Sequence, residues 1–101
     1  MNILDDQFLL FKIDEENEDF IEIKVEDVPI HKLLHKIFIF IIVDPEEKSV
    51  WIWHGEQASI RKKFIAAQKA PEIRNNYGVD FKIIAIDEGN EPPEFKKLVG
   101  L

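Results

Sequence analysis

The spacing of hydrophobic and polar residues predicts strands first. Residues 20–26 alternate, with Ile21, Ile23 and Val25 on one face and charged side chains on the other, which is typical of a half-exposed strand. The apolar segment 8–13 precedes it across an acidic turn, so the two segments predict a β-hairpin. The exposed apolar content of 8–13 would also suit an edge strand that is open to pairing.

Residues 37–43 show no alternation at all. A β-branched and aromatic run of this length predicts a central strand that is covered on both faces. The turn at 44–48 then predicts that residues 50–53 return as its antiparallel partner.

The second half of the chain alternates helices with a strand. A helix is predicted from about 57 to 70, with Glu56 in its first turn and Pro71 closing it. Residues 81–86 predict a further strand, and 92–98 predict a short helix that begins with proline. Because the central strand needs cover on both faces, we expect an α+β fold with the long helix on one face. The C-terminal helix or the connector 31–36 would cover the other.

Composition excludes several classes of protein. A chain of 101 residues predicts a single domain over 1–101. With no cysteine, disulfides, thiolate metal sites and cysteine nucleophiles are excluded. The acidic N-terminus lacks the order of a signal peptide, and no apolar run approaches the ~20 residues of a membrane helix. We therefore expect a soluble, cytoplasmic protein without a membrane span.

Charge is unevenly distributed along the chain. The net charge of −7 argues against a nucleic-acid partner, because phosphate backbones attract basic surfaces. Residues 60–74 nevertheless hold five basic side chains against Glu72 alone: Arg61, Lys62, Lys63, Lys69 and Arg74. This stretch is either the solvated surface of a helix or a docking face for an acidic partner.

Three stretches carry a family resemblance. The first is the apolar strand ending at Asp44 with the aromatic strand Val50-Trp51-Ile52-Trp53-His54-Gly55. The second is the helix with Ala66-Ala67-Gln68 at its middle, and the third is the turn Asp87-Glu88-Gly89-Asn90-Glu91-Pro92. Together they resemble the gelsolin domain, the repeating unit of gelsolin, villin and severin. The resemblance covers residues 36–101 well and residues 8–35 in strand order only.

The resemblance implies both a fold and a partner. It implies a five-stranded, mostly antiparallel mixed sheet between the long helix (about 57–70) and the short C-terminal helix (about 92–98). It also implies that the protein regulates actin or an actin-like protein, docking its long helix in a cleft between two actin subdomains. One domain suits monomer binding or end-capping better than severing. The alternative is a gelsolin-fold module with a non-actin partner, as in vesicle-coat subunits; self-association is also possible.

The long helix offers two faces. At 100° per residue, Ile60, Phe64 and Ala67 cluster on one side, which we expect to face the core. Ile65 lies nearly opposite, and is either half-buried at the sheet edge or an anchor for the partner. The candidate partner-binding residues are therefore Ala58, Arg61, Lys62, Ile65, Gln68 and Lys69.

The resemblance also implies a calcium site, which this sequence does not support. The family takes a Gly-Asp pair at the start of the central strand and a glutamate in the long helix. Here those positions hold His35-Lys36, or Phe38-Ile39 in a shifted register, and Lys62. Lysines repel Ca²⁺, which requires oxygen ligands, so we expect no cofactor.

Other candidate sites have weaker support. The acidic cluster 14–19 lacks the glycine and terminal glutamate of an EF-hand, and His31 and His35 lack a third zinc ligand. Asp87 and Glu88 are adjacent at a strand end, so they point to opposite faces and would make a poor hydrolytic pair. We therefore expect a binding protein and not an enzyme.

Overall fold

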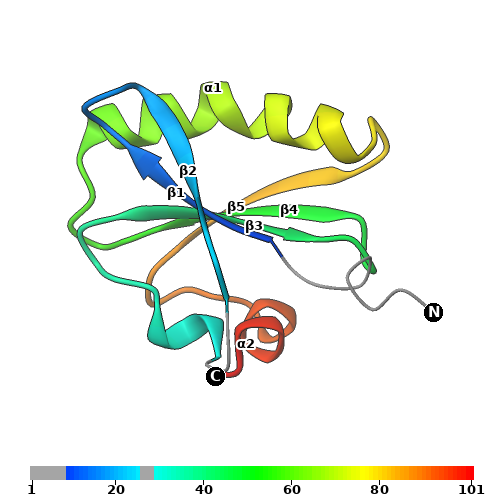
Figure 1. Ribbon diagram of the computed structural model, residues 1–101. Coiled ribbons are helices and arrows are strands. Elements are labelled where there is room, and N and C mark those ends of the chain that lie inside the picture. The colour runs from blue at the N-terminus through cyan, green and yellow to red at the C-terminus, as the bar shows by residue number, and fades with distance from the viewer. Residues whose placement is uncertain (1–8, 26–28) are drawn as a thin grey trace.

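The computed structural model describes residues 9–25 and 29–101, which form three layers (Figure 1). A five-stranded sheet lies in the middle, with the long helix α1 on one face and the short helix α2 on the other. The elements, in chain order, are β1 (Leu9–Asp14), β2 (Asp19–Ile23), the 3₁₀ helix η2 (Ile30–Lys32), β3 (Ile39–Asp44), β4 (Ser49–His54), α1 (Ile60–Tyr77), β5 (Lys82–Asp87) and α2 (Pro93–Val99). The expected α+β architecture is confirmed.

The strand order is β2-β1-β3-β4-β5, which the sequence pattern did not supply. All neighbours pair antiparallel except β4 and β5, which run parallel. The predicted hairpin of β1 and β2 is confirmed, but the expectation of an exposed edge at 8–13 is wrong. β1 pairs with β2 on one side and β3 on the other, so β2 and β5 are the edges. The predicted strand ends at Phe8 and Glu26 lie outside the described residues.

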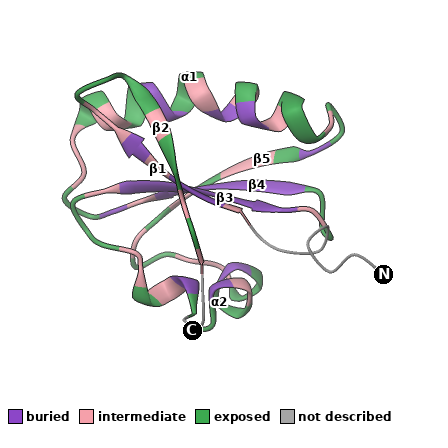
Figure 2. Cartoon of the chain, in the orientation of Figure 1, coloured by how far each residue is buried: buried purple, intermediate pink, exposed green. Residues whose placement is uncertain are grey.

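β3 is the central strand that its composition predicted, and all six of its residues are buried. Its two faces belong to two separate hydrophobic clusters. Figure 2 shows the central strands of the sheet as buried. Ile39, Ile41 and Val43 pack under α1. Phe40 and Ile42 pack on the opposite face, with residues of both α2 and η2. Both the C-terminal helix and the connector therefore cover this second face.

α1 differs from its predicted bounds at both ends. It begins at Ile60 because the Ser59 hydroxyl caps it, accepting a hydrogen bond from the Lys62 backbone N–H at 3.1 Å. Glu56 therefore precedes the helix and is not in its first turn. The helix also runs through Pro71 to Tyr77. Proline removes the backbone bond to residue 67, whose carbonyl belongs to an exposed residue and can bond water instead.

The turn before α2 has a structural role. Gly89 adopts a φ of 93°, a left-handed conformation that glycine reaches without steric cost. The Glu91 carboxylate accepts hydrogen bonds from the Trp53 indole at 2.9 Å and from the Gly89 N–H at 3.0 Å. Burial alone would raise the pKa of Glu91, but these hydrogen bonds outweigh it and lower that pKa. Pro92 then occupies the N-cap position of α2, close to the predicted start.

Candidate partner-binding face of α1

The side of α1 that faces the sheet is the opposite of the side predicted. Ile65 is only 4% exposed and packs in the cluster beneath α1 with Ala66, Ala70 and Ile73. Ala58 is half-buried against the same cluster. The proposal of Ile65 as a partner anchor is therefore wrong, because its side chain is part of the hydrophobic core.

The basic residues predicted to steer a partner contact the acidic hairpin of their own chain. The Arg61 guanidinium lies 2.7 Å from the Glu18 carboxylate. The Lys69 ammonium lies 3.7 Å from Asp19 and 3.3 Å from Glu72. The β1–β2 hairpin therefore neutralises this flank of α1, so the positive charge that we expected to steer an acidic partner is already paired within the chain.

Lys62 makes a different set of contacts at the start of α1. Its ammonium donates a hydrogen bond to the Ile37 carbonyl at 2.8 Å and lies 5.0 Å from the centroid of the Phe38 ring. The Glu15 carboxylate is at 4.0 Å. The long side chain of Lys62 therefore connects the start of α1 to the segment that enters β3 and to the hairpin.

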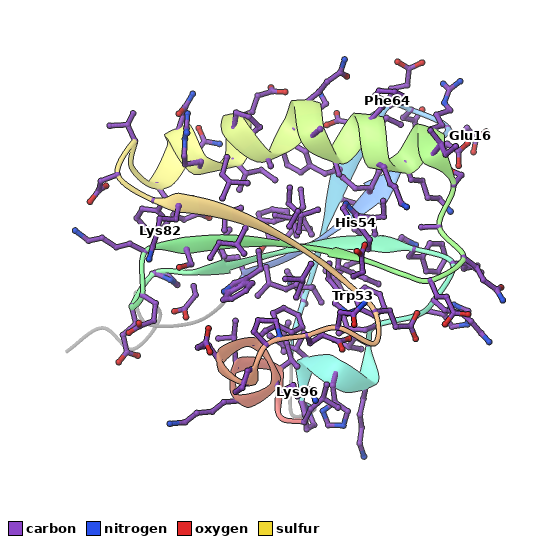
Figure 3. All side chains as sticks on the ribbon, turned by 180° about the vertical axis from the view of Figure 1, so that it is seen from behind. Glu16, Trp53, His54, Phe64, Lys82 and Lys96 are labelled. Atoms are coloured by element: carbon purple, nitrogen blue, oxygen red, sulfur yellow. The ribbon has the colours of Figure 1, made fainter. Side chains whose placement is uncertain are left out.

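The outer face of α1 is where its large apolar side chains reach solvent. We use this name for Ile60, Phe64, Ala67, Gln68 and Pro71, which share the side of the helix away from the sheet. Ile60 is 72% exposed and Phe64 is 68% exposed. Figure 3 shows Phe64 pointing away from the sheet, and Figure 2 shows exposed positions along this side of the helix. Gln68 is the one predicted binding residue that this face retains.

The exposed apolar side chains of this face are of the kind that protein-binding surfaces use. Large apolar side chains left in water gain free energy when a partner covers them, at ~25 cal/mol for each Å² removed from solvent. Aromatic side chains such as that of Phe64 often supply much of the binding energy of an interface. Lys63 is exposed on the first turn of the same helix and can add charge at the rim of this face.

The outer face could have been found from the sequence by one further step. Ile65 and Ile73 are eight residues apart, which places them on the same side of one helix. That pair becomes visible only when the helix continues past Pro71. If the helix is taken to end at residue 70, Ile73 is not among its residues, and Ile65 has no large apolar neighbour on its side of the helix.

The other polar candidates have structural partners. A ring nitrogen of His31 lies 3.0 Å from the Val99 carbonyl oxygen, and the His54 ring lies 3.1 Å from the Asp87 carboxylate. The Glu88 carboxylate accepts from the Glu56 N–H at 2.8 Å, so Asp87 and Glu88 have separate partners. Within 9–25 and 29–101, no three His, Asp or Glu side chains gather as metal ligands. Over those same ranges, no helix is long and apolar enough to cross a membrane.

A recess of about 450 Å³ lies between the β3–β4 turn and α2. Asp44 forms part of its wall and is only 6% exposed. Burial raises the pKa of Asp44, although its carboxylate accepts a hydrogen bond from the Glu47 N–H at 3.3 Å. That hydrogen bond closes the turn, so the carboxyl group has a structural role here.

Comparison with solved structures identifies the fold family. Thorarchaeota ProGel, solved in a complex with rabbit actin, matches with a TM-score of 0.81 and 26% identity, covering 93% of this chain and 100% of ProGel. Thorarchaeota 2DGel3, also solved in a complex with rabbit actin, matches with a TM-score of 0.69 and 26% identity over 96% of this chain. This chain spans 46% of 2DGel3. No protein-family model and no curated protein matches the sequence. The motifs at 41–55 and 84–95, the layered fold and these structures agree: the chain is a gelsolin-like domain.

Proposed function

We propose that this protein binds actin, or an actin-like protein, through the outer face of α1. The observation that carries this proposal is the exposure of Ile60 and Phe64 on a helix whose other side is already packed on its own sheet. ProGel and 2DGel3 were each solved in a complex with actin and share this fold, which supports actin over the non-actin partner of the alternative. Monomer binding or capping of filament ends is the regulatory activity that a single gelsolin-like domain favours.

The contact would work by burial of apolar surface. In solution, Phe64 and Ile60 project from the first two turns of α1, one helical turn apart. An apolar cleft that accepted both would remove them from water together. Because Arg61 and Lys69 pair with the hairpin, the net electrostatic attraction to an acidic partner would be smaller than the sequence suggested.

The test compares two exposed apolar residues. Phe64→Asp should abolish binding to rabbit actin monomers in calorimetry and should abolish the effect of the protein on actin assembly. Val79→Asp is the matched control, because Val79 is also an exposed apolar residue but lies outside α1. A folded Phe64→Asp variant that bound actin as tightly as the unaltered protein would overturn the proposal, as would equal losses in both variants.

We further propose that calcium bound within the domain does not regulate this protein. The residues do not fit the ion: the helix position that the family gives to a glutamate holds Lys62, whose ammonium already contacts the Ile37 carbonyl. A cation bound there would meet a fixed positive charge.

The calcium proposal has its own experiment. Calorimetric titration of the protein with Ca²⁺ should show no tight binding. The affinity for actin should be the same in the presence of Ca²⁺ and in the presence of a chelator. Lys62→Glu tests whether the lysine is the reason, since it restores an acidic ligand at that position. Tight Ca²⁺ binding by the unaltered protein, or actin binding that differed between Ca²⁺ and the chelator, would contradict the proposal.

A further inference from the structure

We propose that two copies of this chain associate edge to edge. The end of β2 and the two residues after it, Lys24 and Val25, pair antiparallel with the same segment of the second copy, centred on Ile23. β2 is an edge strand: it pairs with β1 on one side, and no described strand pairs with its other side. An edge strand presents a row of backbone N–H and C=O groups that can pair with another chain. In Figure 1, β2 lies in front of the sheet and no other described element covers it.

The charges along this edge are complementary to themselves. Glu22 and Lys24 flank Ile23 symmetrically, so antiparallel pairing about Ile23 places Glu22 of each copy opposite Lys24 of the other. Opposite charges directly across two strands stabilise the pairing, and like charges destabilise it. The arrangement is isologous, as a twofold dimer requires, because each copy contributes both members of the pair.

The same register also pairs apolar side chains on the second face of the sheet. Glu22 shares the α1 side of the sheet with Phe11, its partner in β1. Ile23 and Val25 pack on the α2 side, and Ile21 is 46% exposed there. Pairing about Ile23 sets Ile21 opposite Val25 of the second copy, so the exposed isoleucine gains an apolar neighbour.

Other registers are less favourable. Pairing centred on Glu22 places two glutamates across from each other, and pairing centred on Lys24 does the same with two lysines. Parallel pairing in register also aligns like charges. The favoured register joins residues 21–25, of which Lys24 and Val25 continue the chain past the end of β2 at Ile23. The pairing therefore spans about five residues, and we expect a weak dimer that forms with rising concentration.

This dimer does not depend on the actin-binding proposal, because α1's outer face and the β2 edge are different surfaces. Sedimentation equilibrium over a concentration series tests it directly. We expect Glu22→Lys alone and Lys24→Glu alone each to weaken self-association about tenfold, since each converts two attractive pairs into repulsive ones. The double variant carrying both changes should restore it, because the charges are again opposite. A protein that is monomeric at every concentration, or a double variant as weak as the single ones, would overturn the proposal.

A cysteine cross-link tests the register itself. Paired residues in an antiparallel sheet have Cα atoms ~4.5–5.5 Å apart, which lies within the range of a disulfide. The chain has no cysteine of its own, so Ile23→Cys can form a disulfide only with its counterpart in a second copy. Ala85→Cys, on the other edge strand, is the control. Faster oxidative dimer formation by Ile23→Cys supports the proposal, and equal rates refute it.

Discussion

Truncating two adjacent residues of α1 distinguishes its inner face from its outer face by stability alone. Ile65→Ala removes a side chain that is 4% exposed and packs among buried residues of the sheet. Substitutions of this kind lower the free energy of unfolding by ~2–5 kcal/mol, because they lose apolar burial and leave a cavity. A domain of this size has a total stability of ~5–15 kcal/mol, so the loss is a large fraction. It corresponds to a fall in the melting temperature of about 4–8 °C for each kcal/mol.

Phe64→Ala should behave in the opposite way, although it removes a larger side chain. Phe64 is 68% exposed, so its truncation opens no cavity in the core. Alanine also has the higher intrinsic helix propensity, which offsets the contacts that are lost. We expect the free energy of unfolding to change by no more than ~0.5 kcal/mol.

Urea unfolding followed by tryptophan fluorescence measures both changes. Trp51 and Trp53 are buried on the α2 side of the sheet, so neither variant alters the surroundings of the fluorophores in the folded state. If Phe64→Ala lost more than ~2 kcal/mol while Ile65→Ala lost less than ~1 kcal/mol, the assignment of the two faces would be reversed. The proposed binding surface would then be refuted with it.

Two carboxyl groups give further predictions. Burial raises the pKa of Asp44, so its charged form destabilises the fold at neutral pH. Asp44→Asn removes that charge but can still accept the hydrogen bond from Glu47, so at pH 7 the variant should unfold at a higher urea concentration than the unaltered protein. The gain in stability should disappear once the pH is below 3.8, the ordinary pKa of the group. An Asp44→Asn variant that was no more stable than the unaltered protein at pH 7 would contradict this prediction. Glu91→Ala should cost ~1–3 kcal/mol of unfolding free energy, because it leaves the Trp53 indole N–H without its partner. Glu91→Gln keeps an acceptor for the indole N–H. Because the fold lowers the pKa of Glu91, the charged carboxylate stabilises the protein above the ordinary pKa of 4.5, and that stability is lost as the pH falls through the lowered pKa. The Gln variant should not show this acid-dependent loss in urea unfolding.

The strands were predictable from the sequence because their patterns have only one physical solution. The run Ile39–Asp44 is apolar at nearly every position, so it must be covered on both faces, and the structure covers it. Strand order was not predictable in the same way. Nothing in the pattern of β1 states that β2 and β3 both pair with it, because alternation shows which faces of a strand are buried and not which strands lie along its edges.

The helix was the harder element because both of its faces are apolar. Its inner face uses Ala66 and Ala70 beside Ile65 and Ile73, and small side chains allow the helix to pack closely on the β-branched sheet below. Its outer face carries the bulkier Phe64. Choosing the core by side-chain size therefore selects the wrong face, whereas choosing it by the longest continuous stripe, through Ile73, selects the right one. Phe64 is exposed and belongs to neither hydrophobic cluster of the described residues, and that is why we assign it to a partner.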